Sequence, residues 1–172
     1  LSRQVWCLMG LPIDAVSMSE TVEKVDSAIR ERKKLFLTTP NLNFVIGCRN
    51  DDAFRNSVIQ SDLVIADGMP LIWVAKLLNI PIRERVSGSN LFEKLLERNG
   101  IGKKYRIFYF GGQDDVAKRA EEKTANLSSL AVGSGSISPG FVSTTEMSKA
   151  EYIRKINQSE SDILIVALGA KK

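Results

Sequence analysis

Histidine is absent from the 172 residues of the chain. Because histidine is the side chain most often used as a general base near neutral pH and a common zinc ligand, its absence excludes histidine-containing catalytic triads and the usual zinc sites. Any proton transfer must therefore involve an aspartate, glutamate, lysine or tyrosine.

Cysteine and long apolar runs are also scarce. The two cysteines, Cys7 and Cys48, have neither the spacing of a metal site nor the density of a secreted disulfide scaffold. We expect both to be core residues of a protein in a reducing compartment. No apolar stretch reaches the length of a membrane span and residues 1–4 lack a signal-peptide pattern, so we expect a chain that does not itself cross a membrane.

Several ligand-binding motifs are missing as well. The sequence has no G-x-G-x-x-G motif, no Walker G-x-x-x-x-G-K-[ST] motif and no D-x-D triplet that could hold a metal against a diphosphate. The net charge is +4, yet no basic run is longer than residues 32–34. These features favour anionic partners such as phosphates, acidic sugars or an anionic membrane surface over nucleic acid, and they indicate neither a metal nor a nucleotide cofactor.

Strand-like and helix-like patterns alternate along the chain, which is typical of βαβ units around a parallel sheet. We expect strands near residues 5–8, 35–38, 63–66, 106–110, 130–132 and 163–168, and helices near 17–32, 43–61 with a break at Asn50, 70–78, 90–98, 114–125 and 146–158. The pattern predicts an α/β, Rossmann-like fold, with helices on both faces of a mainly parallel sheet, in a single domain over residues 1–172.

Asp67 is the first candidate catalytic residue. It follows the apolar run 63–66, and Gly68 and Pro70 after it suit a tight turn and a new helix. Open α/β sheets bind ligands at the carboxyl ends of their strands, where this carboxylate is expected to lie. The alternative interpretation is that Asp67 only caps the helix that follows.

Polar loops follow three other strands and are expected at the same edge of the sheet. Thr39 and Asn41 could grip a sugar or ribose, or could form an ordinary turn and helix cap. Gly111-Gly112-Gln113 could let backbone N–H groups approach a pyrophosphate. The glycines and the Pro139-Gly140-Phe141 segment of residues 133–141 predict a mobile loop. Its aromatic side chain, Phe141, could cover a base or ring of a ligand, or could simply anchor the loop.

Arg83 and Arg85 precede the expected helix start at residues 86–90. One of them could neutralise a phosphate, although such a charged segment is also typical of a solvated surface.

Six blocks in this order resemble the WecG/TagA/CpsF glycosyltransferases, glycosyltransferase family 26. The blocks are TTPN at 38–41, ADGMP at 66–70, RERVSGSNL at 83–91, FGG at 110–112, PGF at 139–141 and DILIVALGAKK at 162–172. The resemblance implies a Rossmann-like fold and transfer of a sugar, with inversion, from a UDP-sugar to a polyprenyl-diphosphate-linked sugar at the cytoplasmic face of the membrane. Bacterial enzymes of this kind build teichoic acids and other surface polysaccharides.

The resemblance also implies roles for individual residues. Asp67 matches the proposed general base, Thr39 a pocket residue beside it, and Arg85 a cation near the phosphates. Asn41, Gly68 and the loops at Gly111-Gly112-Gln113 and Gly140 fall where donor binding is expected. Family members continue past the last block into a Gln-Glu pair and a C-terminal appendage. Because the sequence stops at Lys172, we expect this appendage and its membrane contact to be missing. We also expect the chain to bind the donor but to turn over poorly.

Two other classes stay open on the sequence alone. One is a Rossmann-type oxidoreductase or methyltransferase that uses residues 133–138 as its cofactor loop. The other is a noncatalytic nucleotide-binding module of flavodoxin-like shape. The identity of the sugar, the exact acceptor and the presence of a homo-oligomer are also left open.

Overall fold

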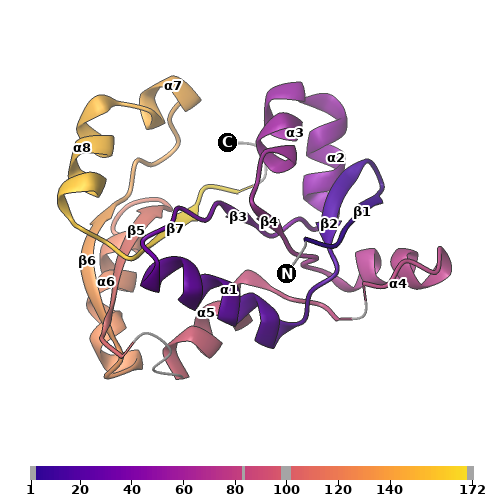
Figure 1. The fold of residues 1–172 in the computed structure, drawn as a ribbon. Helices are drawn as coiled ribbons and strands as arrows, with labels where there is room; N and C mark the ends of the chain where they lie inside the picture. Colours follow the sequence, from indigo (N-terminus) through magenta and orange to yellow (C-terminus); the bar gives the residue numbers. More distant parts are fainter. Residues whose placement is uncertain (1–2, 83, 98–101, 170–172) are drawn as a thin grey trace. The chain divides into compact units, whose positions relative to one another are not determined.

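The structure is a computed structural model that describes residues 3–82, 84–97 and 102–169 (Figure 1). The chain divides into two compact units, Leu1–Leu95 and Leu96–Lys172. Each unit is described by itself. The expected single domain stays a prediction.

The first unit combines short strands with helices. Its elements are β1 (Val5–Leu8), β2 (Leu11–Asp14), α1 (Met18–Arg30), β3 (Leu37–Thr38), α2 (Leu42–Asn50), α3 (Asp52–Ile59), β4 (Leu63–Val64), α4 (Met69–Leu77) and α5 (Gly88–Glu97), the last of which contains the boundary between the units. Strands β1 and β2 form an antiparallel hairpin, whereas β3 and β4 are parallel.

The core of this unit surrounds β4. Val64 is fully buried and belongs to an apolar cluster with residues of β2, α2, α3 and α4. Its backbone N–H donates to the buried carboxylate of Asp14 at 2.7 Å, and Arg3 donates to both oxygens of the same carboxylate at 2.7 and 2.8 Å. A buried charge is tolerated when it is paired and hydrogen-bonded, so these contacts fix β4 against β2.

The second unit is built on a three-stranded parallel sheet. Its elements are β5 (Tyr105–Gly111), α6 (Val116–Leu127), β6 (Ala131–Ile137), α7 (Thr144–Met147), α8 (Ala150–Gln158) and β7 (Ile163–Ala167). The strand order is β6-β5-β7, with the buried β5 in the centre and α6 packed on β5 and β6.

The predicted fold class is confirmed. Helices and strands alternate, and the strand pairs other than the β1–β2 hairpin are parallel, as in a Rossmann-like α/β fold. The capping box of α1 is also as predicted, with Ser17 and Glu20 each bonded to the other's backbone N–H. The break at Asn50 separates α2 from α3.

The prediction of a loop at residues 133–141 is wrong for the first half of this segment. Residues 133–137 belong to β6 and pair with β5. A side chain at Gly133 would overlap Glu121 of α6, and one at Gly135 would overlap Phe108 of β5. These glycines are therefore packing positions in a strand, not the flexible residues of a cofactor loop.

Three smaller expectations are corrected as well. Strand β2 was not predicted, because the turn before it uses Met9 and Gly10, both with positive φ, where an Asn-Gly pair would be the usual signal. The helix predicted at 146–158 is two helices, α7 and α8. Cys48 is buried, which raises the pKa of its thiol, but Cys7 is exposed on β1 and is not a core residue.

Candidate active site

Three segments of the first unit meet at the carboxyl ends of β3 and β4. Thr38 pairs with Val64, and the ladder continues as Ile65 N–H donates to Thr38 O at 3.0 Å and Asp67 N–H donates to Pro40 O at 2.8 Å. Residues 84–88 join on the other side, where Val86 N–H donates to Ala66 O at 3.0 Å. Residues 38–41, 66–68 and 85–88 are therefore held together by backbone hydrogen bonds.

Asp67 lies at the centre of this arrangement. Its side chain is 29% exposed, so the carboxylate is neither sealed in the core nor fully solvated. The N-cap of α4 is Gly68, and among the described residues no side chain caps this helix. The interpretation of Asp67 as a helix cap is thus wrong, and its carboxylate remains available for chemistry.

Gly68 makes the turn between the carboxylate and α4. Its φ of +138° is a conformation that residues with a side chain rarely adopt. This backbone conformation explains why the residue is a glycine. The turn that it forms lets α4 begin directly after Asp67.

Arg85 lies beside Asp67, with 4.0 Å between Nε and Oδ1 and with 41% of its side chain exposed. At this distance and exposure the pair is weak, because water screens it. The guanidinium therefore remains free to bind an anion next to the carboxylate. Arg83, the other candidate cation, lies outside the described residues.

Thr39 packs against the first residue of α5. A side chain at Gly88 would lie 3.4 Å from Thr39 Cγ2, so Thr39 borders the start of this helix. Ser87, which sequence reasoning missed, is buried and accepts a hydrogen bond from Asn90 N–H at 3.3 Å. A serine directly before the first residue of a helix is a favoured helix cap, and this signal could have identified it.

Asn41 is a helix cap. Its side-chain oxygen accepts hydrogen bonds from the N–H groups of Asn43 and Phe44 at 3.0 and 3.2 Å. The ordinary capping interpretation is confirmed for this oxygen, which leaves the amide NH₂ as the group that could donate to a ligand.

Glu84 is a second residue that sequence reasoning missed. Its carboxylate accepts a hydrogen bond from Met18 N–H, at the start of α1, at 3.1 Å. This contact ties the segment that carries Arg85 to a helix 66 residues earlier in the chain. A contact of such long range has no local sequence signal.

The paired glycines at the end of β5 have a structural explanation. A side chain at Gly111 would overlap the backbone of Ala167 in β7, and one at Gly112 would lie 2.9 Å from Val116 Cβ. Gly112 N–H also donates to Ala167 O at 3.2 Å, so this amide is not available to a phosphate. Gln113 is exposed. These residues belong to the second unit, and their predicted meeting with Asp67 stays a prediction.

The turn after β6 also belongs to the second unit. Ser138 Oγ accepts a hydrogen bond from Ala117 N–H at 3.1 Å and so occupies part of the start of α6. Gly140 has open space around its Cα, and Phe141 is exposed. A role of Gly140 in donor binding stays a prediction.

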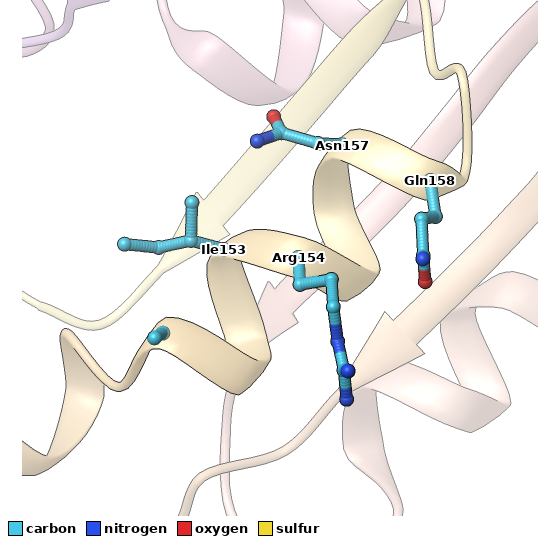
Figure 2. A pocket seen from close by; sticks show the side chains of 5 residues that line it. Ile153, Arg154, Asn157 and Gln158 are labelled. Carbon is cyan, nitrogen blue, oxygen red and sulfur yellow. The ribbon is translucent and has the colours of Figure 1, made fainter.

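Two surface hollows are lined by other residues. One, of about 450 Å³, runs along α8 and is lined by Ala150, Ile153, Arg154, Asn157 and Gln158. Figure 2 shows that their side chains all come from this one helix and point in different directions. Another, of about 300 Å³, lies between the β1–β2 turn and helices α2 and α3. Neither contains a predicted site residue.

Two features are absent from the described part of the chain. Residues 3–82, 84–97 and 102–169 contain no group of three or more cysteine, aspartate or glutamate residues placed to hold a metal ion. Within the same ranges, every helix is too short or too polar to cross a membrane.

Comparison with known proteins identifies a family and relatives from Bacillus and Staphylococcus. Residues 6–172 match the glycosyl transferase WecG/TagA/CpsF family. Proteins named N-acetylglucosaminyldiphosphoundecaprenol N-acetyl-beta-D-mannosaminyltransferase are similar to the chain. The one from Bacillus spizizenii (strain ATCC 23059 / NRRL B-14472 / W23) is 25% identical over 139 residues, which are 81% of this chain and 52% of the relative.

Two further proteins of that name are also similar to the chain. The one from Bacillus subtilis (strain 168) is 25% identical over 77% of this chain and 50% of its own length. The one from Staphylococcus aureus (strain NCTC 8325 / PS 47) is 22% identical over 66% of this chain and 45% of its own length. The chain thus spans about half the length of the curated relatives it matches. The family model covers nearly all of the sequence, including the three segments around Asp67, and the chain therefore belongs to the WecG/TagA/CpsF family of glycosyl transferases.

Proposed function

We propose that the chain carries the catalytic carboxylate of an inverting glycosyltransferase, which moves a hexosyl group such as N-acetylmannosamine from a UDP-sugar to a polyprenyl-diphosphate-linked sugar. The observation that supports this most is the state of Asp67. It is a partly exposed carboxylate at the carboxyl end of a buried strand, it caps no helix in the described chain, and a cation lies 4.0 Å away.

The reaction needs one displacement. Asp67 takes the proton of the acceptor hydroxyl while that oxygen forms a bond to the anomeric carbon of the donor sugar. The bond from this carbon to the diphosphate oxygen breaks on the opposite face, and UDP leaves with the electron pair. Because the configuration is inverted once, no covalent enzyme intermediate is required.

The leaving diphosphate requires positive charge. We assign this charge to Arg85, because its guanidinium is exposed and only weakly paired with Asp67. The starts of α4 and α5 lie on the same three segments, and the N–H groups at helix starts favour anions. Thr39 and the NH₂ group of Asn41 lie on the segment 38–41, which is hydrogen-bonded to the segment that carries Asp67, and we assign them to the donor sugar or ribose. The donor roles of Gly111, Gly112, Gln113 and Gly140 remain part of the proposal.

The relatives support the acceptor class. Their names specify an N-acetylglucosaminyl diphosphoundecaprenol acceptor, which is a lipid. We therefore assign this protein to the cytoplasmic surface of the plasma membrane, with a role in the synthesis of teichoic acid or another surface polymer. The oxidoreductase or methyltransferase alternative loses its main feature, because residues 133–137 form a strand.

Ligand binding tests the proposal without requiring turnover. A ligand that binds only the folded state raises the apparent melting temperature. We expect a shift with UDP and UDP-N-acetylmannosamine and none with NAD, S-adenosylmethionine or FMN at the same concentrations. A shift with one of the latter three and none with UDP would contradict the proposed function.

A further inference from the structure

Glu84 connects the candidate site to the start of α1. Its Oε2 accepts a hydrogen bond from the N–H of Met18, the first residue of the helix, at 3.1 Å. The capping box of α1 provides acceptors for two other N–H groups, those of Ser17 and Glu20. Glu84 therefore supplies one more acceptor, from a distant part of the chain, to a helix start whose N–H groups have no partner within the helix.

Helix α1 is a firm support for this contact. Thr21 and Val22, one turn into the helix, are buried, and Thr21 Oγ1 donates to Ser17 O at 2.8 Å. A carboxylate at a helix start also interacts favourably with the positive end of the helix dipole. The side chain of Glu84 is thus fixed to a part of the fold that buried residues hold in place.

Arg85 lies between two tethered residues. Before it in the chain, Glu84 is bonded to α1; after it, Val86 is buried and donates its N–H to Ala66 O at 3.0 Å. The guanidinium itself is held loosely, with 4.0 Å from Nε to Asp67 Oδ1 and with both side chains partly exposed. The position of Arg85 therefore depends on its backbone, which the contacts of its two neighbours fix.

A cation that is already in place binds an anion more tightly than one that must first be ordered. Immobilising a long side chain costs free energy on binding, and a fixed geometry avoids part of that cost. Loss of the contact between Glu84 and α1 would leave the charge of Arg85 unchanged but its position less defined.

We propose that Glu84 is a positioning residue, which holds Arg85 beside Asp67 by anchoring residue 84 to the start of α1 and so prepares the guanidinium for the donor diphosphate. The identity of this anion rests on the proposed function, whereas the effect of Glu84 on Arg85 does not. No contact between Glu84 and a substrate is part of the proposal.

The sign of the effect separates positioning from simple electrostatics. Glu84 is exposed and adds a negative charge next to Arg85 in the sequence. By charge alone, this carboxylate opposes an anionic ligand, and its removal would strengthen the binding of UDP. If the carboxylate positions Arg85, its removal weakens the binding of UDP although a repulsive charge is lost.

The test compares UDP affinities by calorimetry. Glu84→Ala should weaken UDP binding about threefold, a smaller loss than that of Arg85→Ala because the cation is still present. Glu84→Gln keeps an oxygen that can accept from Met18 N–H and should bind UDP nearly as well as the wild type. In a chain that already carries Arg85→Ala, Glu84→Ala should cause no further loss, because residues that act as a unit are not additive.

Glu20→Gln is the matched control. Glu20 supports the same helix start, and its carboxylate accepts from Ser17 N–H at 2.7 Å and from Ser17 Oγ at 2.8 Å. This variant should loosen the start of α1 and leave UDP affinity unchanged. An equal loss of affinity in Glu20→Gln and Glu84→Ala would show that the stability of α1 matters and not the position of Arg85, and it would overturn the proposal.

Nuclear magnetic resonance adds a readout that needs no ligand. The heteronuclear NOE of the Arg85 Nε–H group, identified by its absence in Arg85→Ala, reports motion of this group on the ps–ns timescale. We expect Glu84→Ala to lower this NOE and Glu20→Gln to leave it at the wild-type value.

The two readouts separate this proposal from the proposed function. If the wild type binds no UDP but Glu84→Ala lowers the Arg85 NOE, the proposed function fails and the positioning role stands. An unchanged NOE in Glu84→Ala overturns the positioning role. Where the wild type binds UDP, unchanged or tighter binding by Glu84→Ala overturns it as well.

Discussion

The two units use the loops after their strands differently. In the first unit, Asp67 follows the short strand β4, and its partly exposed side chain is only weakly paired with that of Arg85, which lies between α4 and α5. In the second unit, Gly111 ends the longer strand β5 and Gly112 follows it, and neighbouring atoms fill the space that their side chains would occupy. A glycine pair after a strand can thus be a requirement of packing, whereas a carboxylate without a structural partner calls for a functional explanation.

The largest expected effect distinguishes two carboxylates that flank β4. Asp67→Asn should reduce turnover about 10²- to 10⁴-fold, because positioned proton transfer typically contributes that much, while UDP affinity and melting temperature stay near the wild-type values. Sugar transfer is measured in the chain and, if it is inactive, in a version extended to the length of the relatives.

Asp62→Asn is the matched control at the other end of the same strand. The Asp62 carboxylate accepts a hydrogen bond from Phe36 N–H at 2.7 Å and is a structural group. This variant should lose some stability and keep its specific activity. Near-normal turnover in Asp67→Asn would remove the carboxylate from the role of base.

A second variant tests the packing explanation in the second unit. Gly111→Ala should lower the free energy of unfolding by about 1–3 kcal/mol or more, because the new methyl group overlaps the Ala167 backbone. Urea denaturation measures the loss. If the variant were as stable as the wild type but bound UDP poorly, the glycine would serve the ligand and the contrast between the units would fail.

Arg85→Ala is expected to have a smaller effect. Loss of one charge-assisted contact to the diphosphate should weaken UDP binding about tenfold. Calorimetry measures this affinity, with Lys76→Ala as a control cation outside the three segments. Unchanged UDP affinity would count against a phosphate role for Arg85.

The smallest effect concerns the capping box of α1. Hydrogen bonds from the backbone and side chain of Ser17 lower the pKa of Glu20 below its ordinary value of 4.5. The ionised carboxylate therefore adds stability above pH 4.5, and this contribution is lost as the pH falls through the lower pKa of the folded state. Glu20→Gln should be slightly less stable than the wild type at pH 7, and the difference should disappear in acid. A difference that grows in acid would contradict this account.

Local patterns predicted most of the fold. The capping box, the break at Asn50 and the strand before Asp67 each depend on residues close together in the sequence, and all were predicted. Strand β2 and the length of β6 were missed because Met9-Gly10 is an unusual turn and because Gly133 and Gly135 have a composition typical of loops.

The candidate site was predicted less completely. Asp67, Thr39 and Arg85 could be selected from short motifs, and the structure holds their three segments together. The role of Asn41 as a cap, the tie between Glu84 and Met18, and the use of Gly112 N–H by Ala167 depend on tertiary contacts that no local pattern indicates.

A crystal structure with bound UDP would test the central assignment most directly. We predict that the diphosphate lies at the carboxyl ends of β3 and β4, within reach of the Arg85 guanidinium and on the same side as the Asp67 carboxylate. A diphosphate bound elsewhere, for example in the hollow along α8, with Asp67 and Arg85 remote from it, would contradict the account.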